Sequence, residues 1–385
     1  MQQLSARVPS RHKELATLKL LIRTAPVEPQ PRRRQARQRG LLAPLILGFF
    51  FILLIAVLLL AISAGSTRIP LESIVQILLN GTRIFHFVPR WDASAEVIIW
   101  QVRLPLVIGA AVVGAALAVA GVLFQGMLRN PLADPYLIGT SSGASLGAAI
   151  SFVLPLDTFY GALFPLTPLL AFLGAIATVL FVYAIARSGR RTPVVTLLLA
   201  GVVINAVMTA FQTVILTFSP QARFAGQALF NWLSGGIAVT GWPPILLVSG
   251  LVLAGSILAF GLSNILDTFA LGEEGAATLG LNVEKARFAI VIIASLITAA
   301  AVSISGLIGF VGLVIPHAIR LLLGPRHRPL IPASALGGAI FLVLADLLAR
   351  TVAAPAVLPV GVCTALVGAP FFLYLLRKSK GEYTW

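Results

Sequence analysis

Long apolar segments follow one another along this chain of 385 residues, and shorter polar stretches separate them. A helix needs roughly 20 mostly apolar residues to cross the hydrocarbon core of a bilayer. The pattern predicts ten such helices, near residues 41–63, 104–126, 135–154, 166–187, 193–217, 244–263, 287–304, 307–323, 331–350 and 357–377. We therefore expect an all-α integral membrane protein with ten transmembrane helices. Small residues within 109–121, among them Gly114, Ala118 and Gly121, predict close helix packing.

Composition supports a membrane protein. Hydrophobic residues make up 58% of the chain and charged residues 11%, whereas a soluble domain carries about 25% charged residues. The single cysteine, Cys363, lies in an apolar segment and has no partner for an internal disulfide. The Cys and His spacings typical of a metal site are absent, so we expect no bound metal.

The basic residues are concentrated at the N-terminus. Residues 1–40 contain ten Lys and Arg residues against two Glu residues. Beside a membrane span, such a segment favours contact with anionic membrane lipid over binding of nucleic acid. We expect a basic cytoplasmic N-terminal tail over 1–40, one ten-span domain over 41–377 and a cytoplasmic C-terminal tail over 378–385.

An even number of spans places both termini on the same side of the membrane. The connections on the side of the basic tail hold Arg129, Arg187, Arg190, Arg191, Lys285, Arg287, Arg326, Arg328, Arg377, Lys378 and Lys380. Lys and Arg are retained in cytoplasmic loops, so this distribution predicts that both termini are cytoplasmic. The adjacent carboxylates Glu273 and Glu274 then also lie on the cytoplasmic side.

Catalytic motifs are missing from the sequence. No G-x-x-x-x-G-K-[ST] loop is present to bind ATP phosphates, and no H-E-x-x-H motif accompanies the four scattered histidines. We therefore expect that the chain is not an enzyme and has no catalytic residues.

Two groups of polar residues lie inside predicted spans. Asp346 and Arg350 are four residues apart, so they can neutralise each other. The sequence does not decide whether this pair has a structural or a functional role. Asn205, Thr209, Gln212 and Thr213 share one helix face. Such a stripe either bonds neighbouring helices or lines a watery path.

Four blocks of sequence, in order, resemble the FecCD-type permeases of type II ABC importers. They are "RLPLVIGAAVVGAALAVAGVLFQGMLRNPLADPYLIGTSSGASLGA" (103–148), "NWLSGG" (231–236), "GEEGAATLGLNVEKAR" (272–287) and "GFVGLVIPHAIRLLLGPRHRPLIPASALGGAIFLVLADLLAR" (309–350). The resemblance implies the type II ABC importer permease fold, located in the inner (cytoplasmic) membrane. It implies import of an iron chelate, a ferric siderophore or haem, by alternating access.

The resemblance also implies partners. These are a second permease chain, expected to form a homodimer, two ABC ATPase subunits, and an extracytoplasmic substrate-binding protein. ATP and Mg would bind to the ATPase, so no cofactor is expected on this chain. Cobalamin is the alternative cargo. An ion-coupled secondary transporter that depends on Asp346 and a structural membrane anchor are the alternatives from other classes.

Three sets of site residues follow from the resemblance. The connection over about 266–282 matches the family's ATPase-coupling helices, with Asp267, Gly272, Glu273, Glu274, Ala276, Ala277, Leu279 and Gly280 as the candidate residues. The acids are expected near a helix start, where they can pair with basic groups of the ATPase, and a solvated loop is the alternative. The stripe from Asn205 to Thr213 matches the helix that lines the translocation path. Arg103 and Arg350 match positions that dock the binding protein, although Leu106 and Val357 depart from the family pattern nearby.

Overall fold

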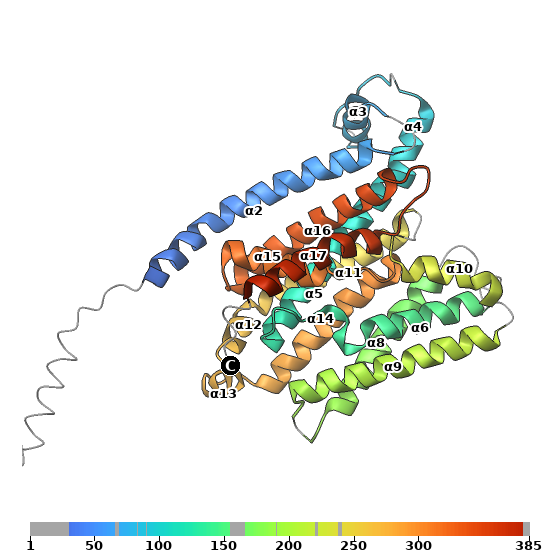
Figure 1. The fold of residues 1–385 in the computed structure, drawn as a ribbon. Helices are drawn as coiled ribbons and strands as arrows, with labels where there is room; N and C mark the ends of the chain where they lie inside the picture. The colour runs from blue at the N-terminus through green and yellow to red at the C-terminus, as the bar shows by residue number, and fades with distance from the viewer. Residues whose placement is uncertain are drawn as a thin grey trace, which may run out of the picture. The chain divides into compact units, whose positions relative to one another are not determined.

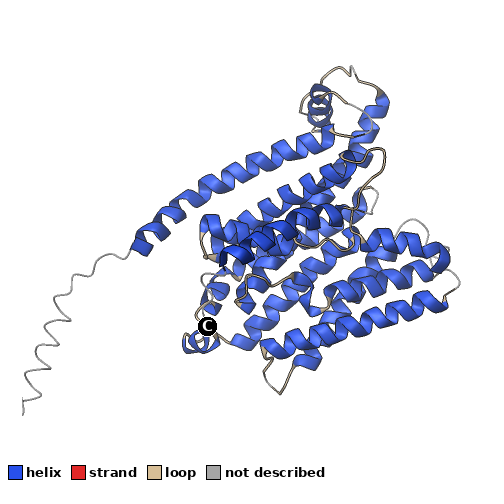
Figure 2. Cartoon of the chain, in the orientation of Figure 1, coloured by secondary structure: helices blue, strands red, loops and turns tan. Residues whose placement is uncertain are grey.

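The computed structural model describes residues 31–65, 69–82, 84–89, 91–154, 166–189, 191–219, 222–237 and 241–379. The predicted tail residues 1–30 and 380–385 lie outside these ranges, as does Arg190. Every regular element in the described ranges is a helix, as Figure 2 shows, and Ser188 and Arg191 form an isolated β-bridge there. The chain divides into two units, Met1–Leu42 and Ala43–Trp385, and the packed helices belong to the second.

Each of the ten predicted spans falls on a helix. The elements are α2 (Pro31–Ser63), α3 (Leu71–Gly81), α4 (Ala93–Val97), η1 (Ile98–Arg103), α5 (Leu104–Leu128), η2 (Pro135–Ile138), α6 (Thr140–Val153), α8 (Leu166–Ala186), α9 (Val194–Phe218), α10 (Ala222–Leu233), α11 (Trp242–Gly261), α12 (Ser263–Phe269), α13 (Glu273–Thr278), α14 (Val283–Ser305), α15 (Val311–Leu323), α16 (His327–Thr351) and α17 (Val360–Ser379). Seven helical segments within the described ranges are long and apolar enough to span a membrane. The other three predicted spans contain α6, α15 and α17. The 14 residues of α6 rise only about 21 Å, less than the ~30 Å hydrocarbon core, so the count of ten stays a prediction.

Residues 64–103, which separate the first two predicted spans, contain the helices α3, α4 and η1. Helix α4 and the π-helix η1 run directly into α5, so that Ala93–Leu128 forms one continuous stretch of 36 residues. This segment contains no Gly or Pro before Pro105, so its polar residues do not interrupt the helix. Arg103 therefore lies within a helix rather than at the end of a loop.

Helices α5 and α14 form the centre of the second unit. Their apolar segments are each 72% buried, whereas those of α2 and α9 are only 17% buried. Helix α5 packs against α16, α14, α15 and α11. Helices α6, α8 and α9 lie side by side in a second group (green in Figure 1), and α14 contacts both α6 and α8.

Glycine allows the helix backbones to touch. A Cβ atom on Gly114 of α5 would overlap the carbonyl oxygen of Gly338 in α16, and one on Gly121 would overlap that of Gly312. The second group repeats this arrangement where Gly143 of α6 meets Gly174 of α8. The predicted close packing along 109–121 is therefore confirmed.

Candidate coupling site and translocation face

Two short helices, α12 and α13, join α11 to α14. Gly272 precedes α13 with a φ of +92°, a backbone conformation that glycine adopts easily. Glu273 and Glu274 occupy the first turn of α13, where the free N–H groups favour negative charge. The predicted position of these two carboxylates at a helix start is confirmed.

The same prediction is wrong for Asp267. This residue lies in the last turn of α12, and its carboxylate accepts a hydrogen bond from the backbone N–H of His327 at 3.0 Å. Nδ1 of His327 lies 2.6 Å from the same oxygen. Asp267 thus satisfies a free N–H at the start of α16, and this contact competes with pairing to another protein.

Glu273 also has a partner within the chain. Its Oε1 lies 2.6 Å from Nη2 of Arg287, a side chain of α14 that is 1% exposed. Nη1 of Arg287 lies 2.7 Å from Oε1 of Glu284, one helical turn earlier. The carboxylate of Glu273 is half exposed, so one side of it faces the Arg287 side chain and the other faces outward.

The remaining residues of the connection divide into inward and outward sets. Ala276 is fully buried, so the predicted apolar face does not include it. Glu274, Ala277 and Gly280 are exposed, and the Leu279 side chain is 68% exposed. Within the described part of the chain, Glu274 makes no hydrogen bond or ion pair. Glu274, Ala277 and Leu279 therefore form the outward surface of α13.

The polar residues of α9 differ in their surroundings. Asn205 is half-buried and accepts a hydrogen bond from the Ser142 hydroxyl of α6. Thr209 and Thr213 are exposed, and their hydroxyls donate to the carbonyls of Asn205 and Thr209, at 2.8 and 2.9 Å. The Gln212 side chain is half-buried and has no hydrogen bond to the residues that the structure describes. Asn205 therefore bonds a neighbouring helix, and the two threonines lie on the exposed side of the single chain.

The arginines of the predicted docking site lie at the end of α2. Arg103 is 6% exposed, and its Nη1 donates to the carbonyls of Ile62 and Ser63 at 2.8 and 3.3 Å. Arg350 lies 2.8 Å from Asp346 and donates to the Ala64 carbonyl at 3.5 Å. Both guanidinium groups thus satisfy the last carbonyls of α2, which have no partner within that helix. These contacts leave little of Arg103 for a binding protein, and the docking role stays a prediction.

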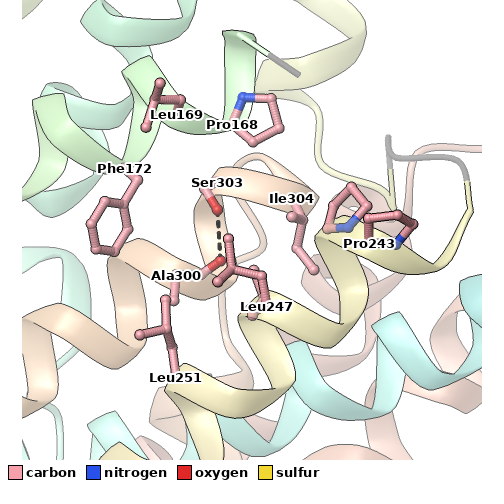
Figure 3. Close-up of a pocket in the computed structure, with 11 residues that line it drawn as sticks. Pro168, Leu169, Phe172, Pro243, Leu247, Leu251, Ala300, Ser303 and Ile304 are labelled. Carbon is pink, nitrogen blue, oxygen red and sulfur yellow. Dashed lines mark hydrogen bonds between the residues drawn. The ribbon is translucent and has the colours of Figure 1, made fainter. Parts of the chain in front are cut away.

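An apolar pocket of about 240 Å³ lies between α8, α11 and α14 (Figure 3). Its polar side chain is Ser303, whose hydroxyl donates to the Ala300 carbonyl at 2.8 Å. The pocket is smaller than the roughly 300–1,000 Å³ of most ligand sites. It also offers no free polar group to bind a charged iron chelate. This pocket therefore does not have the features of a translocation path, and the path along α9 stays a prediction.

Sequence reasoning missed several polar contacts besides that of Asp267 with His327, and two of them involve conspicuous residues. One is the contact of Arg287 with both Glu273 and Glu284. The other joins α5 to α15, where Gln125 donates to the Gly312 carbonyl at 3.1 Å and accepts from Arg320 at 2.9 Å. The i,i+3 spacing of Glu284 and Arg287 was a usable signal. The partners of Gln125 are more than 180 residues away in the sequence, so no local pattern signalled these contacts. Within the described ranges, no three His, Cys, Asp or Glu side chains form a group that could hold a metal ion.

The profile of the FecCD transport family matches residues 53–378, which include nearly all the packed helices. The chain belongs to the FecCD transport family. Among curated FecCD-type relatives, the hemin transport system permease protein HmuU of Yersinia pestis is 37% identical, over 88% of this chain and 97% of its own. The cobalamin import system permease protein BtuC of Halobacterium salinarum is 42% identical, over 74% and 75% of the two chains.

A solved structure agrees with the family assignment. It is a metal-chelate type ABC transporter in an inward-facing conformation, with a TM-score of 0.73 and 30% identity over 87% of this chain and 99% of its own. As a FecCD member, the chain is a multi-pass membrane protein of the ABC permease class, whose subunits are not themselves enzymes.

Proposed function

We propose that this chain is the permease subunit of an ABC importer that moves an iron chelate, a ferric siderophore or haem, across the cytoplasmic membrane. Separate subunits hydrolyse ATP, and an extracytoplasmic protein delivers the cargo. The hemin permease relative supports this cargo class. The cobalamin permease relative makes a corrinoid the second candidate.

The observation that carries the proposal is the position of α13. One face of this short helix is tied to α14 through Glu273, and the other presents Glu274, Ala277 and Leu279 outward. A carboxylate beside an exposed leucine suits a contact with a basic-rimmed groove on an ATPase. Charge pairs at such a contact chiefly set its register and its rate of association.

The translocation path would lie between two copies of the chain. Thr209 and Thr213 are exposed on the single chain, on a helix whose apolar segment is only 17% buried, and Gln212 is half-buried beside them. In a membrane, a glutamine side chain without a hydrogen-bond partner has a free-energy cost, because it has lost its hydrogen bonds with water. A second copy opposite α9 would supply the other wall of a polar path and remove this cost.

The test is reconstitution in proteoliposomes with the cognate ATPase and binding protein. Uptake of a ferric hydroxamate siderophore, haem and cobalamin would be measured side by side, with and without ATP. We expect ATP-driven uptake of one iron chelate, and Glu274→Lys should weaken ATPase binding about tenfold because it reverses the charge at the contact. Lys285→Met, which also changes an exposed charge nearby, is the matched control. Uptake that persists without the ATPase subunits would overturn the proposal.

A further inference from the structure

A cluster of charged groups around the buried Arg287 side chain connects α13 to the segment before α9. Arg287 contacts Glu273 of α13 through one nitrogen and donates from the other, Nη1, to the Thr192 carbonyl at 2.6 Å. The backbone N–H of Thr192 donates to Oε2 of Glu284 at 3.1 Å. Thr192 is 1% exposed and is followed by Pro193, the residue that precedes α9. The cluster therefore joins the consecutive helices α13 and α14 to the Thr192 segment, which lies 95 residues before Arg287 in the sequence.

Only an arginine fits this cluster. Its planar guanidinium presents five N–H donors in fixed directions, whereas a lysine presents one compact charge. Here the two terminal nitrogens serve two carboxylates and one carbonyl at distances of 2.6 to 2.7 Å. The Arg287 side chain is buried and needs a carboxylate partner, which Glu284 of its own helix supplies, while Glu273 links the same guanidinium to α13.

The cluster connects the segment before α9 to α13 and α14, which the packing along the rest of α9 does not do. Along its length α9 packs against α6 and α8. Two residues before α9 begins, the Thr192 backbone is held on its N–H by Glu284 and on its C=O by Arg287. A shift of Glu273 therefore pulls on the same guanidinium that fixes the residue next to α9.

We propose that Arg287 is a positioning residue that carries a displacement of α13 to α9. This inference rests on the proposed function, in which an ATPase moves α13 and α9 lines the path. When α13 moves, Glu273 would draw the Arg287 guanidinium with it, and the Thr192 backbone would follow. The polar face of α9 would then change its position together with the ATPase state.

The experiment compares transport with ATP use in the same vesicles. The full complex would be reconstituted with whichever of ferric hydroxamate, haem and cobalamin the unaltered chain transports. We expect Arg287→Met and Glu273→Gln each to lower uptake per ATP hydrolysed by about tenfold, within the range typical of coupling between two sites. Arg287→Lys should give an intermediate ratio. The double variant should be no worse than either single one, since both remove the same link.

The controls separate the possible causes of a loss. Lys285→Met removes an exposed charge two residues away and should leave the ratio unchanged. Copurification of the ATPase should be normal in all variants; a defect confined to ATPase binding would overturn the inference, because the cluster would then only support the contact surface. If Arg287→Met fails to fold, Glu273→Gln decides, since its carboxylate is half exposed. A normal ratio of uptake to ATP hydrolysis in Glu273→Gln would overturn this inference but leave the proposed function standing. Absence of ATP-driven uptake by the unaltered chain would overturn the proposed function as well.

Discussion

Several arginine side chains of this protein donate hydrogen bonds to backbone carbonyl groups. Arg103 donates to Ile62, Arg350 to Ala64 and Arg287 to Thr192. The first two carbonyls lie at the C-terminal end of α2, where no intrahelical N–H reaches them. A guanidinium is always charged and has several donors, so it can bond a carbonyl and a carboxylate together. Arg350 does so with Ala64 and Asp346.

Replacement of Arg103 separates this structural role from docking. Arg103→Met leaves the carbonyls of Ile62 and Ser63 without their donor. We expect the free energy of unfolding to fall by about 1–3 kcal/mol, measured by thermal or denaturant unfolding in detergent. In Arg103→Lys, which keeps a charged donor group, the free energy of unfolding should fall by less than in Arg103→Met. If stability is unchanged while delivery by the binding protein falls, the docking role predicted from the sequence is the correct one.

At the scale of elements, the contact between α5 and α16 depends on glycine. A methyl group on Gly338 would overlap the Gly114 carbonyl oxygen, so Gly338→Ala forces the helices apart. We expect a loss of about 1–3 kcal/mol in stability, seen as a lower yield of monodisperse protein.

Gly250 of α11 is the matched control for this contact, because no atom lies within 4 Å of a Cβ placed there. Gly250→Ala should be neutral or slightly stabilising, since alanine favours a helix over glycine by about 0.5–1 kcal/mol. Equal yields for the two variants would contradict the close-packing argument.

The polar side chains of α9 fall into two sets by their hydrogen bonds. Asn205 bonds Ser142 of α6, so Asn205→Leu should lower stability by about 1 kcal/mol. Thr209 and Thr213 bond only carbonyls of their own helix, so the valine variants should fold normally. If the threonines line the path, these variants should slow ATP-driven uptake about fivefold, equivalent to about 1 kcal/mol. Normal uptake in both valine variants would assign the stripe to packing alone.

At the scale of the whole molecule, burial separates central from peripheral helices. The apolar segments of α5 and α14 are 72% buried, and those of α2 and α9 are 17% buried. In a membrane, the exposed faces of α2 and α9 contact lipid or another protein. The threonines of α9 make it the better interface for a second copy.

A cross-linking experiment tests this interface. In a Cys363→Ser background, Thr213→Cys should form covalent dimers with a bifunctional maleimide in native membranes, because the two α9 helices would face each other. Leu253→Cys, on α11 with 63% exposure, is the control and should stay monomeric. The reverse pattern, or dimers only after mixing with a related permease, would contradict a homodimer built on α9.

The sequence by itself determined the class of protein and the positions of its helices. Runs of about 20 apolar residues cannot remain in water, so hydropathy alone located every segment that became a long helix. Gly272 followed by two acids marked the start of α13, because glycine conformation and helix-end charge are local effects. Motifs in four blocks carried the FecCD resemblance, which the family match then showed.

The tertiary structure alone decided which polar groups far apart in the sequence are partners. Asp267 and His327 are 60 residues apart, and Thr192 and Arg287 are 95 residues apart, so no local pattern signals either contact. Arg103, which was predicted to dock a binding protein, is buried, and so is Ala276, which was predicted to contact the ATPase. Side-chain pairing in a membrane protein depends on which helices pack together, and helix packing depends on shapes distributed over the whole chain.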